Sequence, residues 1–492
     1  MTTLAAHWLL EEPGSQPARR DVAVHLEHGR IRAVEPLERP PVGARRLVLP
    51  ALANAHDHAR TFRSATLGAF ARPLESWLPF LGIVPGVDPY LCAATSFARS
   101  ARRGVAALMV HYTRIQGTLP YLEEALAVAR AAHDVGLHIG FAVAMRDRHG
   151  IAYCEDVRVL EALHPDVRSA VAHRLAAPAT SAAEQITRVD ELNAVLHGAG
   201  LDRQVTLQYG PTGVQWCSDA LLEAIACASA DTGRPVHMHL LETQYQRQWA
   251  DATHPDGIVR HLGRIGLLNP RLTLAHCTWA RPDELALLAE HGVTIAVNTS
   301  SNLGIRSGIA PVAEMLRQGC RIAMGLDGLA LDEDDDALRE MRLTNALHRG
   351  WGYDETMSPA QLWAFAAHHG RRSVGAVDEG GRIATGEPAD LMVLDWESLD
   401  DDGLWPDIDP LELLLARAHG SHLRQLFVGG RLLVDEGRVI TVDEDALKAE
   451  MLAQVRSRLR DEPQWARWRE QVQVLAEDLG PFYRQARWSG CC

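Results

Sequence analysis

The segment Asn54-Ala55-His56-Asp57-His58 constrains the fold more than any other, because it directly follows the apolar run Leu47–Leu52. Such a run predicts a buried strand, and side chains alternate between the two faces of a strand. His56 and His58 are therefore expected to point the same way and to share one metal ion. The chain has 23 histidines, so one His-x-His pair could arise by chance. The interpretation depends on what ends the other apolar runs.

Three further apolar runs also end in residues that bind metals or move protons. The runs are Val236–His239, Leu272–His276 and Arg321–Leu326. The chemistry-bearing residues at their ends are His237, His239 and Glu242, then His276, and then Asp327. Four matched ends in one chain predict a shared site, and ordinary buried polar residues are a poor explanation for all of them.

The central part of the chain alternates strand-like runs with helical patterns. The candidate strands are Leu52–His56, Val105–His111, His138–Ala144, Val205–Tyr209, Val236–His239, Leu272–His276, Thr294–Val297 and Arg321–Leu326. Helical segments such as Tyr121–Val135 and Ser218–Ala230 lie between them. Eight strands alternating with helices predict an α/β fold, a (β/α)₈ TIM barrel, in which reactive residues lie at the C-terminal strand ends.

Short strands with Gly and Pro turns occur at both ends of the chain, which predicts a small β-sandwich domain around an inserted barrel. The predicted domains are residues 1–49 plus 386–440 for the β domain, 50–385 for the hydrolase barrel, and 441–492 for a C-terminal helical extension. The long segment from about 59 to 100 follows the first barrel strand, and we expect it to lie over the site.

Composition excludes several classes of function. A net charge of −14 argues against nucleic acids and anionic membranes, which both bind basic patches. No apolar stretch approaches the roughly 18–20 residues that span a bilayer. Met1–Glu12 has no basic segment before its short apolar part, so we expect no secretory signal there. The 8 cysteines lack framework spacing, so we expect a soluble cytoplasmic protein with reduced thiols. Lys448 is the single lysine, so no barrel lysine can serve as a Schiff base, general base or carboxylated metal bridge.

The predicted metal ligands are His56, His58, His239 and Asp327. Three imidazoles and one carboxylate suit Zn²⁺ or Fe²⁺ and leave a position for water. The pKa of a bound water falls from 15.7 towards about 7, which supplies hydroxide at neutral pH. Glu242 lies where it could shuttle protons. His276 could ligate the metal or orient the hydroxide, and Asp327 could also accept the first proton.

The motifs at these strand ends resemble the metal-site motifs of the amidohydrolase superfamily. They are Asn54-Ala55-His56-Asp57-His58, His237-Met238-His239-Leu240-Leu241-Glu242, Ala275-His276-Cys277 and Gly325-Leu326-Asp327-Gly328. The branch that they resemble most includes cytosine, guanine and S-adenosylhomocysteine deaminases and the s-triazine hydrolases. Asn298–Pro311 resembles the strand-seven loop of that branch, but Thr299-Ser300-Ser301-Asn302 lacks the proline of the usual Pro-x-Ser-Asn motif. The resemblance covers roughly residues 20–440.

The resemblance implies one divalent metal, hydrolytic attack on a C–N carbon, and release of ammonia or an amine. It assigns the same four metal ligands, the proton shuttle to Glu242, and the histidine facing the hydroxide to His276. Binuclear relatives need a strand-four lysine, and Val205–Tyr209 contains none. Zn²⁺ is favoured over Fe²⁺, and we expect a homo-oligomer, with a dimer favoured.

Deamination of a small nitrogen heterocycle is the leading hypothesis. The alternatives are hydrolysis of an amide, carbamate or carbon–halogen bond on a small ring, and, more remotely, a catalytically silent scaffold. The candidate substrate contacts are Trp77, His111, Gln208 and Asn302, each with buried packing as the alternative. Asp332–Asp336 predicts a solvated loop or helix start and not a cation site. The terminal Cys491-Cys492 predicts an unstructured end.

Overall fold

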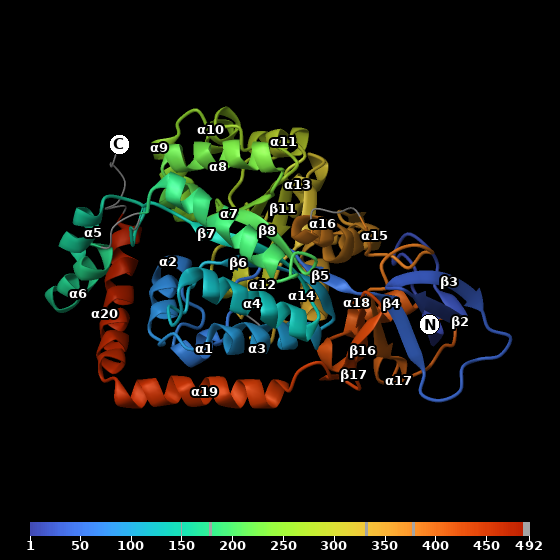
Figure 1. Ribbon diagram of the computed structural model, residues 1–492. Helices are drawn as coiled ribbons and strands as arrows, with labels where there is room; N and C mark the ends of the chain where they lie inside the picture. The colour runs from blue at the N-terminus through green and yellow to red at the C-terminus, as the bar shows by residue number, and fades with distance from the viewer. Residues whose placement is uncertain (149, 177–179, 330–332, 376–378, 486–492) are drawn as a thin grey trace.

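The computed structural model describes residues 1–148, 150–176, 180–329, 333–375 and 379–485. Two eight-stranded sheets dominate it, one in the barrel and one in a separate domain (Figure 1). Within the described residues, no helix has the length and apolar character needed to cross a membrane.

Eight parallel strands form the barrel, in chain order. They are β5 (Leu52–Asn54), β6 (Val105–Tyr112), β7 (His138–Met145), β8 (Val205–Pro211), β9 (Val236–Leu240), β10 (Leu272–His276), β11 (Thr294–Val297) and β12 (Arg321–Met324). A bond of 2.8 Å from the Ala55 amide to the Met324 carbonyl links the last strand to the first. The predicted TIM-barrel fold is confirmed, and each strand starts at the predicted residue.

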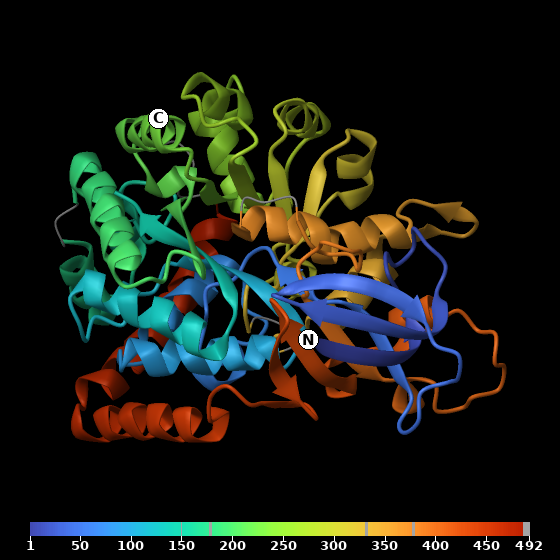
Figure 2. The ribbon, with the colours of Figure 1, turned by 45° about the vertical axis from the view of Figure 1, so that its right-hand side comes forward.

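Helices cover the outside of the barrel (Figure 2). They include α3 (Pro89–Ala101), α4 (Tyr121–Val135), α7 (Ala182–Gly198), α8 (Asp219–Thr232), α9 (Gln244–Thr253), α10 (Ile258–Arg264), α11 (Pro282–Glu290), α13 (Val312–Arg317) and α14 (Ala337–His348). In α4 the buried residues Ala125, Val128 and Ala132 recur at helical spacing, so one face packs on the barrel. The helix ends at Gly136, whose φ of 99° suits glycine.

A short helical segment closes the barrel at the N-terminal ends of its strands. The segment consists of η3 (Ala364–His369) and α16 (Gly370–Gly375). Ser373 hydrogen-bonds Thr273 at 3.1 Å, near the start of β10, and His369 donates to the Ile322 carbonyl at 2.6 Å, near the start of β12. The opposite, C-terminal end is therefore the end available for a site.

The second sheet combines strands from both ends of the chain. Its order is β18 (Arg438–Val439), β17 (Arg431–Asp435), β16 (Leu423–Val428), β15 (Leu391–Asp395), β4 (Arg46–Pro50), β1 (Thr2–Leu9), β2 (Arg19–Glu27) and β3 (Arg30–Pro36). The antiparallel pairing of β4 with β15 joins the two halves. Since only Ala51 separates β4 from β5, this domain is directly continuous with the strand that leads to His56.

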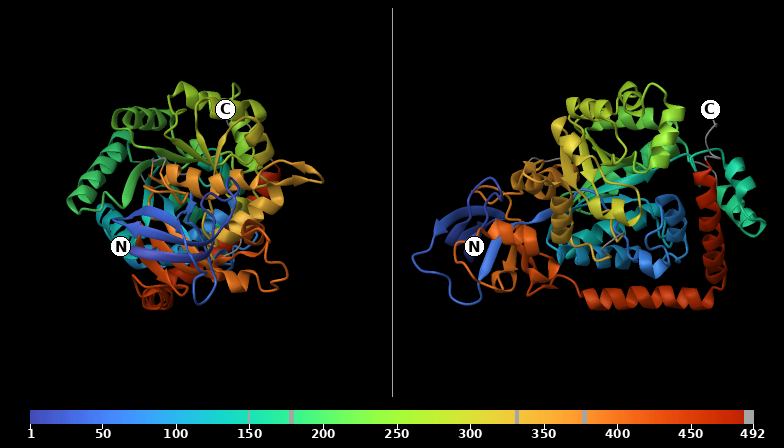
Figure 3. Two further views of the ribbon diagram at one scale, coloured as in Figure 1. Left: turned by 90° about the vertical axis from the view of Figure 1, so that its right-hand side faces the viewer. Right: turned by 180° about the vertical axis from the view of Figure 1, so that it is seen from behind.

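The C-terminal extension forms two long helices, α19 (Glu444–Asp461) and α20 (Gln464–Arg484) (Figure 3). We call residues 59–100 the covering segment; it contains α1 (Ser64–Leu67), α2 (Leu74–Trp77), η1 (Leu78–Gly82) and α3. α20 packs against α2 and η1, and against α5 (Asp156–Ala162) and α6 (Pro165–Leu175). These elements share an apolar core separate from that of the barrel; its members include Leu74, Trp77, Phe80, Trp468, Val472 and Leu479.

The remaining described elements lie outside the barrel wall. They are α12 (Thr299–Gly304), α15 (Pro359–Trp363), α17 (Trp396–Leu399), α18 (Pro410–Arg417), η2 (Val214–Trp216), η4 (Gly420–His422), and the hairpin of β13 (Gly350–Trp351) and β14 (Asp354–Glu355). In the acidic run, Asp336 caps the start of α14 and Asp335 pairs with Arg99 at 2.6 Å, so both are buried and not solvated. Asp332 and Cys491-Cys492 lie outside the described residues.

Candidate metal centre

The His-x-His pair lies beyond the end of its strand. β5 ends at Asn54, so the expectation that His56 and His58 share one face of a strand is wrong in this detail. Their rings meet edge to face, with centroids 4.9 Å apart and planes at 81°. The two rings are therefore brought together by a loop that hydrogen bonds hold in place, and not by the alternation of side chains along a strand.

Asn54 organises this loop. Its Oδ1 accepts hydrogen bonds from the backbone amides of His56 (3.3 Å) and Leu326 (3.0 Å). Its Nδ2 donates to Asp57 Oδ2 at 2.8 Å, and Asp57 Oδ1 accepts from the His58 amide at 2.7 Å. One amide side chain thus joins the ends of β5 and β12, which places both histidines beside Asp327.

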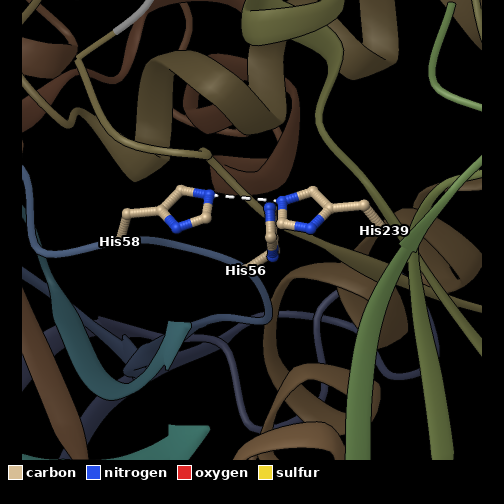
Figure 4. Close-up of side chains that lie close together, drawn as sticks. All are labelled: His56, His58 and His239. Atoms are coloured by element: carbon tan, nitrogen blue, oxygen red, sulfur yellow. Dashed lines mark hydrogen bonds between the residues drawn. The ribbon is translucent and has the colours of Figure 1, made fainter. Parts of the chain in front are cut away.

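The predicted metal ligands lie close together at the C-terminal end of the barrel, and Figure 4 shows the three histidines among them. Asp327 Oδ1 lies 3.1 Å from His58 Nε2 and 3.4 Å from His56 Nε2. His58 Nε2 lies 3.3 Å from His239 Nε2. All four side chains are buried. The donor atoms of His56, His58 and His239 lie within 4.8 Å of one another, and so do those of His56, His276 and Asp327, so two possible ligand triads share His56.

Hydrogen bonds on the far side of two rings show that their near sides carry lone pairs. His58 Nδ1 donates to the His111 carbonyl, and His239 Nδ1 donates to the Thr212 carbonyl, both at 2.7 Å. A neutral imidazole has one N–H, so both Nε2 atoms are acceptors that face each other at 3.3 Å. His56 Nε2 is buried without a hydrogen-bond partner in the described part of the chain. The donor set therefore fits a divalent metal.

The protonation states of the four predicted ligands also favour the binding of a cation. Burial lowers the pKa of His56 to about 3 and also lowers the pKa values of His58 and His239, so all three are neutral at pH 7. Burial alone would raise the pKa of Asp327. The positive charge of the Arg60 guanidinium nevertheless holds that pKa well below its usual range. The site thus offers three neutral imidazoles and one anion.

Glu242 stands beside the ligands in the opposite protonation state. Burial raises the pKa of Glu242 well above its ordinary value, and the charges of Asp327 and Glu75 raise it further. Its Oε1 lies 3.8 Å from His276 Nε2. A carboxyl group that stays protonated near neutral pH can donate a proton to a substrate.

His276 is held by Asn302. Its Nδ1 donates to Asn302 Oδ1 at 2.9 Å, and its Nε2 lies 4.0 Å from Asp327 Oδ2. Burial lowers the pKa of His276, so the ring is neutral with a lone pair on Nε2. This arrangement is compatible with metal ligation and with orientation of a water molecule.

Strained backbone gathers at these strand ends. Leu241, His276 and Asp327 adopt φ values of 49°, 76° and 57°. Non-glycine residues in this region cost of order 1–3 kcal/mol each, and they persist where the surrounding structure fixes them, which is frequent at active sites. Here the turns aim Glu242, His276 and Asp327 inward.

Three of the four predicted substrate contacts lie close to the site. The His111 ring stacks on His239, with centroids 4.9 Å apart. Trp77 packs over the Arg60 guanidinium at 4.7 Å. Asn302 is fully buried and its oxygen is occupied by His276, which gives it a role in holding that ring.

Gln208 is different. Its amide donates to the carbonyls of Ser373 (2.9 Å) and Val374 (3.1 Å) in α16, at the closed end of the barrel. Its side chain is used to fix this plug, so we do not expect it to contact a substrate.

Sequence reasoning missed three residues that act on the ligands. Ser301 donates to Asp327 Oδ2 at 2.6 Å, and Arg60 Nη1 lies 3.3 Å from Asp327 Oδ1. His237 Nε2 accepts from His56 Nδ1 at 2.7 Å, so it orients a ligand in addition to filling the barrel. The one available signal was proximity in sequence: Arg60 follows His58 by two residues.

Comparison with known proteins agrees with this architecture. The model of the Amidohydrolase family matches residues 47–433. The chain is 32% identical over 254 residues to a 5'-deoxyadenosine deaminase of Methanosarcina barkeri, which covers 50% of this chain and 58% of that protein. It is 34% identical over 256 residues to a 5-methylthioadenosine/S-adenosylhomocysteine deaminase of Moorella thermoacetica, covering 52% and 59%. The chain thus spans about three fifths of these relatives' lengths.

Other matches extend over most of the chain. A 5-methylthioadenosine/S-adenosylhomocysteine deaminase of Nitratidesulfovibrio vulgaris is 27% identical over 460 residues, covering 92% of this chain and 95% of that protein. An adenosine deaminase from Xanthomonas campestris with bound zinc has a TM-score of 0.72 at 22% identity, covering 96% and 98%. A mutant atrazine chlorohydrolase from Arthrobacter aurescens, with zinc and atraton, has a TM-score of 0.74 at 21% identity, covering 92% and 100%. The structural matches share the fold, and the family model covers most of the sequence: the chain belongs to the amidohydrolase family.

Proposed function

We propose that the protein is a zinc-dependent aminohydrolase that deaminates a small nitrogen heterocycle. The observation that carries this proposal is the pair of unprotonated Nε2 atoms of His58 and His239, which face each other at 3.3 Å beside an ionised Asp327. His56, His58, His239 and Asp327 would hold the metal. A buried, protonated carboxyl group, Glu242, stands next to them.

The chain's own residues can divide the proton transfers among them. A bound divalent metal would supply hydroxide near neutral pH. Asp327 is ionised and can accept a proton through Oδ2, the oxygen that Ser301 holds and that faces His276. Glu242 can donate its proton to a ring nitrogen of the substrate, the leaving amine can then take the proton held by Asp327, and the new C–OH group of the product can return a proton to Glu242. His276, neutral and fixed by Asn302, can orient the attacking group.

The relatives support a purine or purine nucleoside as the substrate. Three of the similar curated proteins are named as deaminases of 5'-deoxyadenosine, 5-methylthioadenosine or S-adenosylhomocysteine. In each of these compounds the amine that a deaminase removes sits on an amidine-like ring carbon. A proton donor beside the metal ligands fits this chemistry.

A substrate panel tests the proposal. Zinc-loaded protein would be incubated with 5'-deoxyadenosine, 5-methylthioadenosine, guanine and cytosine, and ammonia and products would be measured together. We expect one ammonia per product molecule with at least one of these compounds. Turnover that yields product without ammonia or an amine would contradict deamination, and chloride release from a chlorotriazine would point to the carbon–halogen alternative.

Metal identity, location and assembly belong to the same proposal. We propose Zn²⁺ over Fe²⁺, a cytoplasmic location, and a homodimer. The described cysteines are all free, which agrees with a reducing compartment. Metal analysis of protein purified without chelators tests the first point, and light scattering after gel filtration tests the last.

A further inference from the structure

A cavity lies beside His58, between the barrel and the covering segment. Its walls come from the loop after β5, from α1, η1 and α3, and from the end of β6. The lining residues include His58, Arg60, Tyr112, Arg114 and Gln116. His58 is both a wall of this cavity and a proposed metal ligand, so the cavity adjoins the metal site at that ring.

Two arginines line the cavity, and each has guanidinium N–H groups that donate no hydrogen bond within the described residues. Arg60 uses Nη1 on Asp327, while within the described residues its Nε and Nη2 make no hydrogen bond. Arg114 donates from Nη2 to the Val84 carbonyl at 2.7 Å and forms no ion pair with any described residue. A guanidinium has five donors and stays charged in proteins, so most of this capacity is unused.

No acidic side chain offsets this charge inside the cavity. Of the described residues that line it, none is Asp or Glu. The nearby Glu124 is already occupied by the Tyr112 hydroxyl (2.7 Å) and the amides of Gln116 (2.6 Å) and Gly117 (2.9 Å). Asp88 caps α3 through the Tyr90 amide at 2.8 Å.

The charge of the cavity lining is therefore positive, opposite in sign to the net charge of the whole chain. The whole chain carries a net charge of −14, yet the described lining of this partly enclosed space holds two guanidinium groups and no carboxylate, and only one of the two, Arg60, has a counter-ion, Asp327. Low-dielectric walls focus such a field, and a partly buried cation without a counter-ion is costly. Planar guanidinium groups match carboxylate and phosphate oxygens in two-point hydrogen bonds.

We propose that this cavity is an anion subsite that binds a carboxylate or phosphate group of the substrate, with the ring of that substrate at the metal. This inference rests on the proposed function, and it narrows the substrate class to heterocycles that carry an acidic substituent. Arg114 supplies the binding charge, while Arg60 is shared between the anion and Asp327.

Binding of simple anions tests the subsite without turnover. Zinc-loaded protein would be titrated with acetate and with inorganic phosphate by calorimetry. We expect Arg114→Gln to raise the dissociation constant of whichever anion binds by at least tenfold while the zinc content stays unchanged. Arg114→Lys should raise that dissociation constant less. The matched control is Arg32→Gln, which removes an exposed arginine paired with Glu27 in the β domain and should change nothing. Equal binding to Arg114→Gln would place the anion on the metal alone and would overturn the proposal.

Substrate preference gives the second test and separates carboxylate from phosphate. The values of kcat/KM would be compared for neutral 5'-deoxyadenosine, for S-adenosylhomocysteine and for adenosine 5'-monophosphate. We expect Arg114→Gln to lower the ratio of kcat/KM for an acidic substrate to kcat/KM for the neutral one by at least tenfold. Arg32→Gln should leave that ratio unchanged. An unchanged ratio in Arg114→Gln contradicts the subsite. If no compound is deaminated but anion binding is lost in Arg114→Gln, the proposed function fails and the subsite stands.

Discussion

At the residue scale, two backbone carbonyls determine what the proposed ligands can do. The carbonyls of His111 and Thr212 take the Nδ1–H groups of His58 and His239, so each Nε2 is left as a lone pair pointing inward. Burial then keeps the rings neutral by lowering their pKa values. Orientation and protonation are both fixed before any metal binds, which reduces the cost of binding it.

This preorganisation has a consequence for proton release. Three exposed histidines of pKa 6.5 would lose about two protons when they bind a metal at pH 6. Here burial lowers the pKa values of all three proposed ligands, that of His56 to about 3 and that of His239 well below 6.5, so at least these two rings are already deprotonated at pH 6. We expect fewer than one proton released per zinc at pH 6, measured by calorimetry in two buffers of different ionisation enthalpy. Release of about two protons would contradict the neutral-ring assignment.

Substitution separates the ligands from the proton donor. Glu242→Gln preserves shape but cannot donate the acidic proton, so we expect metal content to stay near that of the wild type while kcat falls about 10²–10⁴-fold. His239→Ala removes a ligand and should lower both metal content and turnover. Metal analysis and kcat measured on the same preparations check this. Equal metal loss in the two variants would show that Glu242 is itself a ligand.

The sequence predicted these ligands but not the residues that hold them. His56, His239 and Asp327 could be found because each stands at the end of an apolar run. Arg60 and Ser301 lie in loops and in a short helix, where no periodicity tells which way a side chain points. Their contacts with Asp327 depend on how separate strand ends meet in space.

At the element scale, hydrophobic runs located the barrel strands well because each is buried and bounded by polar or turn residues. All eight starts agree with the prediction, and the ends differ by at most two residues. The plug formed by η3 and α16 was not predicted. Nothing local in Gly370–Gly375 shows that it closes the barrel, since this follows from contacts with residues such as Thr273, about a hundred positions away.

The plug gives a test of packing at the closed end. A Cβ atom added at Gly140 in β7 would lie 2.7 Å from both Met109 Cε and the Val374 carbonyl oxygen of α16. We expect Gly140→Ala to lower the free energy of unfolding by about 1–3 kcal/mol, because the crowded neighbours must shift. Gly198→Ala is the matched control, since a Cβ there meets nothing within 4 Å and should stabilise by about 0.4–1 kcal/mol. Urea unfolding measures both, and equal effects would exclude tight packing of the plug.

At the scale of the whole molecule, there are two large apolar cores, one in the barrel and one between the covering segment and the C-terminal helix α20. The second core joins α20 to the covering segment, where Ser76 Oγ donates to the Ala476 carbonyl at 3.2 Å. A polar path continues inward. The Tyr483 and Tyr153 rings lie 5.7 Å apart, Tyr153 donates to Glu75 at 3.1 Å, and the Thr243 hydroxyl donates to Glu75 at 2.6 Å. Thr243 is adjacent to Glu242, so this path connects the C-terminal extension to the proposed proton donor.

Disrupting α20 should therefore loosen the cover while the barrel persists. Leu479 is 0% exposed in the second core, and Leu479→Asp would bury a charge there at a cost of several kcal/mol. Leu459→Asp in α19 is the control, because Leu459 is 41% exposed. We expect Leu479→Asp to retain its zinc, to lose most turnover, and to be cleaved by protease within residues 59–100 faster than the wild type or the control. Cleavage equal to that of the control would mean that α20 does not hold the cover in place. Loss of zinc together with turnover would mean that the extension and the barrel unfold as one unit, because a cover held by α20 alone must open before the residues at the barrel strand ends are disturbed.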